Sequence, residues 1–174
     1  MFISTEIRLN IAFNAAQDKL ADLVRGGVLG RASGGAYDHW QAGLARLGPR
    51  RTMLGMYRIA RVRVTEVVTR ADSALWAMRW EVTDTRGALV PALDAEIKLI
   101  PAGEDTTMLA VSGVCRPPLA KLAEPDPTAA HQVAQAMIQA FTSRIATDIA
   151  DPVTVPEAGL RALLPEPTPG NHMP

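Results

Sequence analysis

The chain has 174 residues, with 18 basic and 18 acidic side chains, so its formal net charge is zero. Hydrophobic residues make up 48 % of the chain and charged residues 21 %, a composition typical of one globular domain. This balance argues against a polyanionic partner such as nucleic acid. Cys115 is the single cysteine, which excludes an intramolecular disulfide, and we expect it to be buried at the end of a strand.

The N-terminal stretch MFISTEIRLNIAF lacks the basic start and the long apolar run of a signal peptide. No apolar run approaches the roughly 20 residues that a membrane-spanning helix needs. The sequence therefore predicts a cytoplasmic protein without a transmembrane segment.

The first elements are a strand and two short helices. Residues 3–11 alternate between apolar and polar side chains, which predicts a half-buried strand. Asn14 has a side chain suited to cap the helix that follows. The glycine-rich stretch 26–35 is interpreted as a flexible joint, and as a hypothetical gate beside a binding cavity. A second short helix is predicted over 36–47.

The middle of the chain predicts an antiparallel meander. Strands are expected over 57–70, 75–84, 92–100 and 106–115, because apolar residues alternate in each and short turns separate them. The alternation of apolar and polar residues is interrupted at 66–68, which indicates a bulge in the strand 57–70.

A long amphipathic helix is predicted over 128–150, with Asp126 as its cap and Pro127 in its first turn. Its apolar stripe contains Val133, Met137, Phe141 and Ile145.

This order of elements resembles the START-like superfamily, also called SRPBCC, which includes polyketide cyclases and pollen allergens. The resemblance rests on the strand 3–11, the helix opening at Asn14, the meander ending in TTMLAVSGVCRPP, and the helix 128–150. It covers about residues 2–150 and brings no catalytic signature. The sequence departs from the family in its proline-rich link before the last helix. It also offers fewer clear strands, unless RRTML (50–54) is a strand or 57–70 forms two.

The resemblance implies an α+β helix-grip fold, in which a curled antiparallel sheet wraps around a long C-terminal helix and two short helices follow the first strand. The predicted domains are a START-like domain over 1–151 and a proline-rich, partly disordered tail over 152–174, with a short helical turn at 157–164. An NTF2-like cone is the rival fold. It ranks second because it usually begins with helices and lacks a long closing helix.

The apolar face of the strand 75–84 carries Trp76, Met78, Trp80 and Val82. These side chains either fill a solid core or line a cavity for an apolar ligand. The candidate ligand-binding residues are Glu66, Trp76, Met78, Trp80, Leu93, Ile97, Leu109, Met137 and Phe141. Glu66 has two interpretations: a buried proton acceptor or ligand anchor, or a surface acid if the bulge turns it outward and Val67 inward.

Three functions follow, and the sequence leaves all three open. The first is binding of a small hydrophobic or amphipathic ligand between the sheet and the C-terminal helix. The second is an aromatase, cyclase or dehydratase, which needs convergent polar groups such as Glu66 with Tyr37 or His131. The third is an interaction module with a filled cavity. No residue pattern indicates a catalytic residue, a metal site or a cofactor, and the oligomeric state is unknown.

The opposite face of the same strand is charged. Arg79 and Glu81 are expected to face Arg63, Asp94 and Glu96 on neighbouring strands, forming a solvated ladder of opposite charges.

Overall fold

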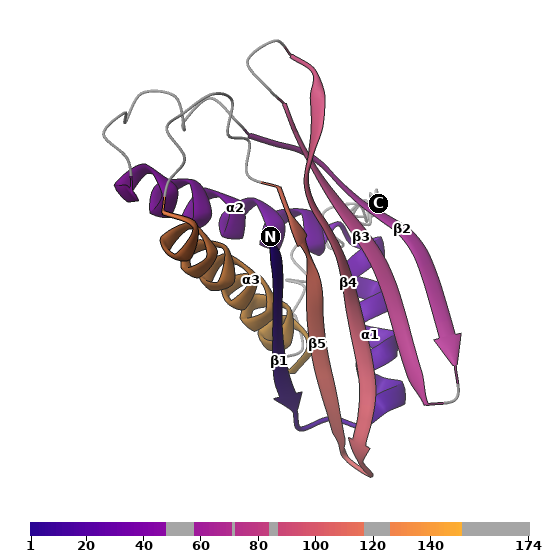
Figure 1. Cartoon of the computed structure of the whole chain (residues 1–174). Coiled ribbons are helices and arrows are strands. Elements are labelled where there is room, and N and C mark those ends of the chain that lie inside the picture. Colours follow the sequence, from indigo (N-terminus) through magenta and orange to yellow (C-terminus); the bar gives the residue numbers. More distant parts are fainter. Residues whose placement is uncertain (48–57, 71, 84–86, 117–125, 151–174) are drawn as a thin grey trace, which may run out of the picture.

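The computed structural model (Figure 1) describes residues 1–47, 58–70, 72–83, 87–116 and 126–150. Within these ranges, the side chains outside the description are those of Ala45, Leu47, residues 58–60, Thr65 and Glu66. The predicted extra strand at 50–54, the tail 152–174 and the helical turn at 157–164 lie outside the described residues.

Five strands form one antiparallel sheet. They are β1 (Phe2–Leu9), β2 (Arg58–Arg70), β3 (Ser73–Thr83), β4 (Leu89–Gly103) and β5 (Thr106–Cys115). Their order across the sheet is β1-β5-β4-β3-β2, so the first strand pairs with the last and the described sheet has β1 and β2 at its edges. The sequence prediction of a meander from β2 to β5 is confirmed.

Three helices lie on one side of this sheet (Figure 1). They are α1 (Phe13–Arg25), α2 (Val28–Leu47) and α3 (Pro127–Ala150). Helix α3 packs against β1 and β5, whereas α2 packs against β2 and α3. Helix α1 packs against β4 and β5, so all three helices contact the same side of the sheet. The predicted α+β helix-grip class is confirmed.

Alternation of side chains explains how β3 forms. Every second residue of this strand is buried: Ala74, Trp76, Met78, Trp80 and Val82. Side chains of a strand point alternately to its two faces, so this set makes one face apolar while the intervening residues remain partly or fully exposed. The predicted inward direction of the two tryptophans is confirmed.

The glycine-rich stretch 26–35 is not a joint, and this prediction is wrong from residue 28 onward. Helix α2 begins at Val28 and continues without a break to Leu47. Leu29, Ala32 and Ala36 are buried, so their packing against the core offsets the low helix propensity of the intervening glycines. A gate over this stretch would therefore be a helical segment and not a loop.

Two local predictions are also corrected. The cap of α1 is Ala12 rather than Asn14, and no side chain caps this end. The helix begins early because Phe13 packs against the core as its first residue. The first strand ends at Leu9 rather than at residue 11.

The predicted bulge in β2 is present, because the pairing register between β2 and β3 shifts between Val64 and Glu66. Beyond it, Val67 pairs with the inward-facing Trp76 and so lies on the inner face of the sheet, as one interpretation predicts. Its side chain is still 55 % exposed, because β2 is an edge strand of the described sheet.

Helix α3 follows its prediction closely. The Asp126 carboxylate accepts a hydrogen bond from the backbone amide of Thr128 at 3.1 Å, and Pro127 occupies the first turn. Met137, Phe141 and Ile145 of the predicted stripe are buried. The helix therefore lays one apolar side on the sheet.

Candidate functional site

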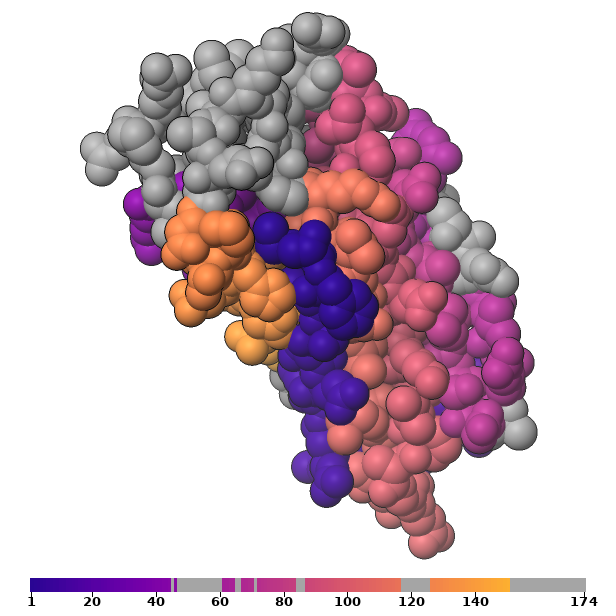
Figure 2. Space-filling view, viewed as in Figure 1, coloured from indigo at the N-terminus to yellow at the C-terminus, as the bar shows by residue number. Residues whose placement is uncertain are grey.

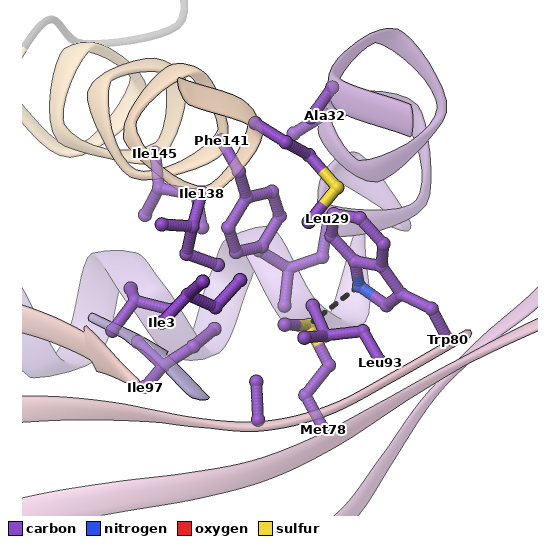
Figure 3. Close-up of a cluster of buried hydrophobic side chains, with 14 of the residues drawn as sticks. Ile3, Leu29, Ala32, Met78, Trp80, Leu93, Ile97, Ile138, Phe141 and Ile145 are labelled. Carbon is purple, nitrogen blue, oxygen red and sulfur yellow. Dashed lines mark hydrogen bonds between the residues drawn. The ribbon is translucent and has the colours of Figure 1, made fainter. Parts of the chain in front are cut away.

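The core between the sheet and the helices contains a compact aromatic and sulfur cluster (Figure 3). The rings of Trp80 from β3 and Phe141 from α3 meet edge to face, with centroids 5.2 Å apart and planes at 78°. Figure 3 shows Met78, Leu93 and Ile97 rising from the sheet toward Phe141, with Leu29 and Ala32 of α2 on the other side. Two helices and two strands thus contribute side chains to the cluster around Trp80. The sequence predicts its contacts between β3 and α3, but not the contribution of α2.

Trp80 has an unusual polar contact inside this cluster. Its indole Nε1 donates to the Sδ atom of Met78 at 3.3 Å, and both side chains are buried. An indole N–H is only a donor, and a thioether sulfur is a weak acceptor. The polar group at the centre of the cluster therefore makes a weak hydrogen bond.

The structure brings the apolar candidate residues into one core. Their exposed fractions range from 0 to 2 %: Trp76, Met78, Trp80, Leu93, Ile97, Leu109, Met137 and Phe141. A side chain that lined a water-sized void would present surface to it, so in this conformation these eight pack against protein atoms. A ligand among them requires some of these side chains to move.

Glu66 differs from the other candidates. Its backbone lies next to the bulge and pairs with Ala77, but its side chain is outside the described residues. A role for its carboxylate therefore remains a prediction.

Helix α2 contributes a buried serine that the sequence analysis missed, on the same helix as Tyr37 and Trp40. Ser33 and Trp40 are 0 % and 1 % exposed, and neither the Ser33 hydroxyl nor the Trp40 indole nitrogen has a hydrogen-bond partner in the structure. Tyr37 lies between them in the helix, is fully buried, and meets Trp40 edge to face at 5.3 Å. Their spacing of three and four residues is helical. Tyr37 and Trp40 fall in the predicted helix 36–47, whereas Ser33 was missed because the stretch 26–35 was interpreted as a joint.

The histidines do not converge on this core. His39 and His131 are exposed, and His172 lies outside the described residues. Across the described part of the chain, no three His, Cys, Asp or Glu side chains gather closely enough to hold a metal ion.

The outer face of the sheet carries the predicted charge ladder. Arg79 lies 2.5 Å from Asp94, and Arg63 lies 3.5 Å from Glu81. Arg116 also contacts Asp94. Burial acts to raise the pKa of Asp94, but the hydrogen bonds from Arg116 and Arg79 outweigh it and hold that pKa below its ordinary value.

Cys115 lies at the end of β5 and is buried, as predicted. Burial raises the pKa of its thiol to about 12, and the N-terminal ammonium of Met1 offsets this only in part. A thiol with so high a pKa is a poor nucleophile at neutral pH, so Cys115 has the features of a structural residue.

Two depressions of the described surface lie outside the core cluster. One, of about 560 Å³, lies on the outer face of β3, β4 and β5, beside the exposed Phe2 and Val114. Figure 2 shows the molecule with β1 in indigo next to β5 in orange. The other, of about 450 Å³, lies between α2 and α3 and is lined in part by Arg31, His39 and Arg144. Neither reaches Trp80 or Phe141.

Taken with its element order, this geometry defines a helix-grip fold, the fold class that the sequence predicts. No protein-family model and no curated protein matches the sequence. Among solved structures, the chain is similar to the Zhui aromatase/cyclase from Streptomyces sp. R1128, with 10 % identity, coverage of 86 % of this chain and 91 % of that chain, and a TM-score of 0.38.

A conserved protein from Geobacillus kaustophilus has 15 % identity, coverage of 86 % and 95 %, and a TM-score of 0.40. A START superfamily protein from Mycobacterium smegmatis has 11 % identity, coverage of 83 % and 96 %, and a TM-score of 0.34. Similarity at this level identifies neither a ligand nor a reaction for this chain. None of the described helices combines the length and the apolarity needed to cross a bilayer.

Proposed function

We propose that this protein binds a small apolar or amphipathic molecule between the inner face of its sheet and helices α2 and α3. The observation that carries the proposal is the hydrogen bond of the buried Trp80 indole, whose acceptor is the Met78 thioether. A ligand oxygen is a stronger acceptor than a thioether, so a bound molecule improves the bonding of a group that the fold already buries.

The apolar side chains around this donor supply the remaining driving force. Burial of apolar ligand surface contributes roughly 25 cal/mol per Å². Edge-to-face rings such as Trp80 and Phe141 offer flat apolar surfaces to a ligand.

Room for the ligand comes from the methionines. Met78 and Met137 both belong to the core, and an unbranched thioether side chain changes shape more easily than a branched one. Binding is therefore coupled to repacking: the closed core is the unliganded state, and the ligand displaces methionine side chains from it. The same step separates the Met78 sulfur from the Trp80 indole, so it alters tryptophan fluorescence.

The direct test is native mass spectrometry of the purified protein, followed by fluorescence titration with N-phenyl-naphthylamine and oleic acid. We expect a co-purified small molecule or saturable binding of one probe. Trp80→Phe, which keeps an aromatic ring but removes the N–H, weakens binding of an oxygen-bearing ligand. The exposed Val114→Ala, on the outer face of β5 opposite Asp94, serves as a control and leaves binding unchanged. A protein that carries no small molecule and binds neither probe refutes the proposal and favours an interaction module with a filled core.

A further inference from the structure

Two buried polar groups of α2 have no hydrogen-bond partner among the residues that the structure describes. They are the Ser33 hydroxyl oxygen and the Trp40 indole nitrogen. Both residues are almost completely buried, so bulk water does not satisfy them either. Nearly all buried polar groups in folded proteins are hydrogen-bonded, and leaving one unpaired costs free energy. Two such groups on one helix therefore need an explanation.

Three other buried polar side chains of the described residues do have partners. Thr107 donates to the backbone oxygen of Ile11 at 2.8 Å, and Thr142 donates to that of Ile138 at 2.8 Å. The Asp148 carboxylate accepts from Arg144 at 3.1 Å. The buried Oε2 atom of Glu81 accepts no hydrogen bond among the described residues, but it lies 3.5 Å from the Arg63 guanidinium. Ser33 and Trp40 thus differ from these four residues.

The two groups lie along one line of the helix. They are separated by seven residues, which is nearly two full turns, so they project in almost the same direction and lie about 10 Å apart along the axis. The side of α2 that contacts α3 is marked by Gly43, which approaches Val133. Around the helix axis, Ser33 and Trp40 lie about a sixth to a quarter of a turn from Gly43. They belong to the buried stripe of α2 that also contains Leu29 and Leu44, and Leu29 faces the cluster around Trp80 (Figure 3).

We infer that Ser33 and Trp40 form hydrogen bonds to neutral oxygen atoms of the bound ligand. This inference rests on the proposed function and specifies the class of molecule. An indole N–H needs an acceptor, and a serine hydroxyl provides a second donor about two helical turns away. The ligand is therefore not a plain hydrocarbon. It is an elongated, largely apolar molecule with two acceptors, such as ketone, ether or hydroxyl oxygens, on the order of 10 Å apart, the rise of two helical turns.

The charge of the site supports neutral oxygens. The buried polar and charged side chains of the described residues are Ser33, Thr107, Thr142 and Asp148, and none of them is a cation. A carboxylate or phosphate in this core would lose its hydration without a counter-charge, which is far more costly than burial of a neutral carbonyl.

The helix around Ser33 is rich in glycine, which lowers its stability as a helix. Gly30, Gly34 and Gly35 surround it, and a Cβ atom added at any of the three would meet nothing within 4 Å. Packing therefore does not require glycine at these positions, yet glycine weakens a helix relative to alanine. The segment that covers Ser33 opens more easily than an alanine-containing helix would, which gives a ligand access to a closed core.

The test compares a rigid steroid diketone that has a ketone at each end, androstenedione, with its hydrocarbon parent, androstane. Both are measured by displacement of N-phenyl-naphthylamine. Ser33→Ala and Trp40→Phe each remove one donor while keeping most of the side chain. Thr142→Val is the matched control, because its buried hydroxyl already bonds to its own helix.

We expect each donor variant to weaken binding of the diketone by about 2- to 10-fold, the effect of one neutral hydrogen bond, and to leave androstane binding unchanged. Thr142→Val leaves the affinity for both probes unchanged. Ser33→Ala is also expected to unfold at the same or a higher temperature than the natural chain, because its hydroxyl has no partner to lose. A purely structural serine would lower that temperature.

The results separate this inference from the proposed function. If the diketone binds to Ser33→Ala and Trp40→Phe as tightly as to the natural chain, the roles assigned to Ser33 and Trp40 are wrong. The proposed binding function is then unaffected. A drop in Ser33→Ala stability without change in diketone affinity also overturns the inference. If neither steroid displaces the fluorescent probe, although that probe itself binds, the assigned ligand class is wrong. If the fluorescent probe, oleic acid and both steroids all fail to bind, both proposals fall.

Discussion

Substitution by alanine is expected to raise the free energy of unfolding at one glycine of helix α2 and to lower it at another. A Cβ atom at Gly34 meets nothing within 4 Å, so Gly34→Ala gains the full difference in helix propensity, about 1 kcal/mol. A Cβ atom at Gly43 would lie 2.5 Å from Cγ1 of Val133 and 3.4 Å from its Cγ2. Val133 is β-branched and stiff, so the clash is not relieved by a simple rotation.

The cost of the clash outweighs the gain in propensity at Gly43. Overpacking of this kind costs about 1–3 kcal/mol, so after the propensity gain Gly43→Ala is expected to destabilise by up to about 2 kcal/mol. Urea unfolding followed by circular dichroism measures both variants, with the slope of the transition unchanged. The control is the Val133→Ala background, where Gly43→Ala becomes stabilising because the clashing methyl groups are gone.

The stability of Gly43→Ala also tests the close contact between α2 and α3. If Gly43→Ala stabilises the natural chain as much as Gly34→Ala does, the two helices do not approach each other as described.

Three further predictions concern single residues. Cys115, with its pKa raised to about 12, resists iodoacetamide in the folded protein at mildly alkaline pH and reacts once urea unfolds it; mass spectrometry showing rapid labelling of the folded chain would contradict its burial. Asp94 has a folded pKa below its ordinary value of 3.8, so it contributes stability above that pH, and this contribution is lost as the pH falls through the folded pKa. Asp94→Asn therefore lowers the urea midpoint at neutral pH, and its difference from the natural chain shrinks in acid; a difference independent of pH would argue against the ion pairs. Asp126→Ala removes the acceptor for the Thr128 amide and is expected to cost about 1 kcal/mol in urea unfolding, whereas Asp126→Ser retains most of the stability. Equal losses in both variants would show that the cap is not responsible.

The sequence predicted the strands and the last helix well because their periodicity is strong. The inward set of β3, from Trp76 to Val82, follows directly from alternation, and β5 ends at Cys115 as predicted. The cap at Asp126 was predictable because an acid followed by proline suits a helix start. These features depend on local chemistry that tertiary packing reinforces.

Helix α2 was mispredicted because local and tertiary preferences disagree there. Four glycines between residues 30 and 43 lower its intrinsic helix propensity, while the burial of Leu29, Ala32 and Ala36 favours the helix. That competition cannot be resolved from the sequence. The error also concealed Ser33, because a serine within a loop has no reason to be buried. The apolar part of the candidate site was therefore predictable, and its polar part was not.

The position of β2 has a consequence for how the protein behaves at high concentration. This strand pairs with β3 alone in the part of the chain that the structure describes, so its other side is a row of backbone groups that another copy could extend into a larger sheet. Arg61, Arg63 and Arg70 are exposed along it, and the register shift next to Glu66 makes the strand irregular. Like charges repel an incoming identical strand, and a kinked strand is a poor template for one. We therefore expect replacement of these arginines by neutral residues to favour pairing between copies of the protein through β2.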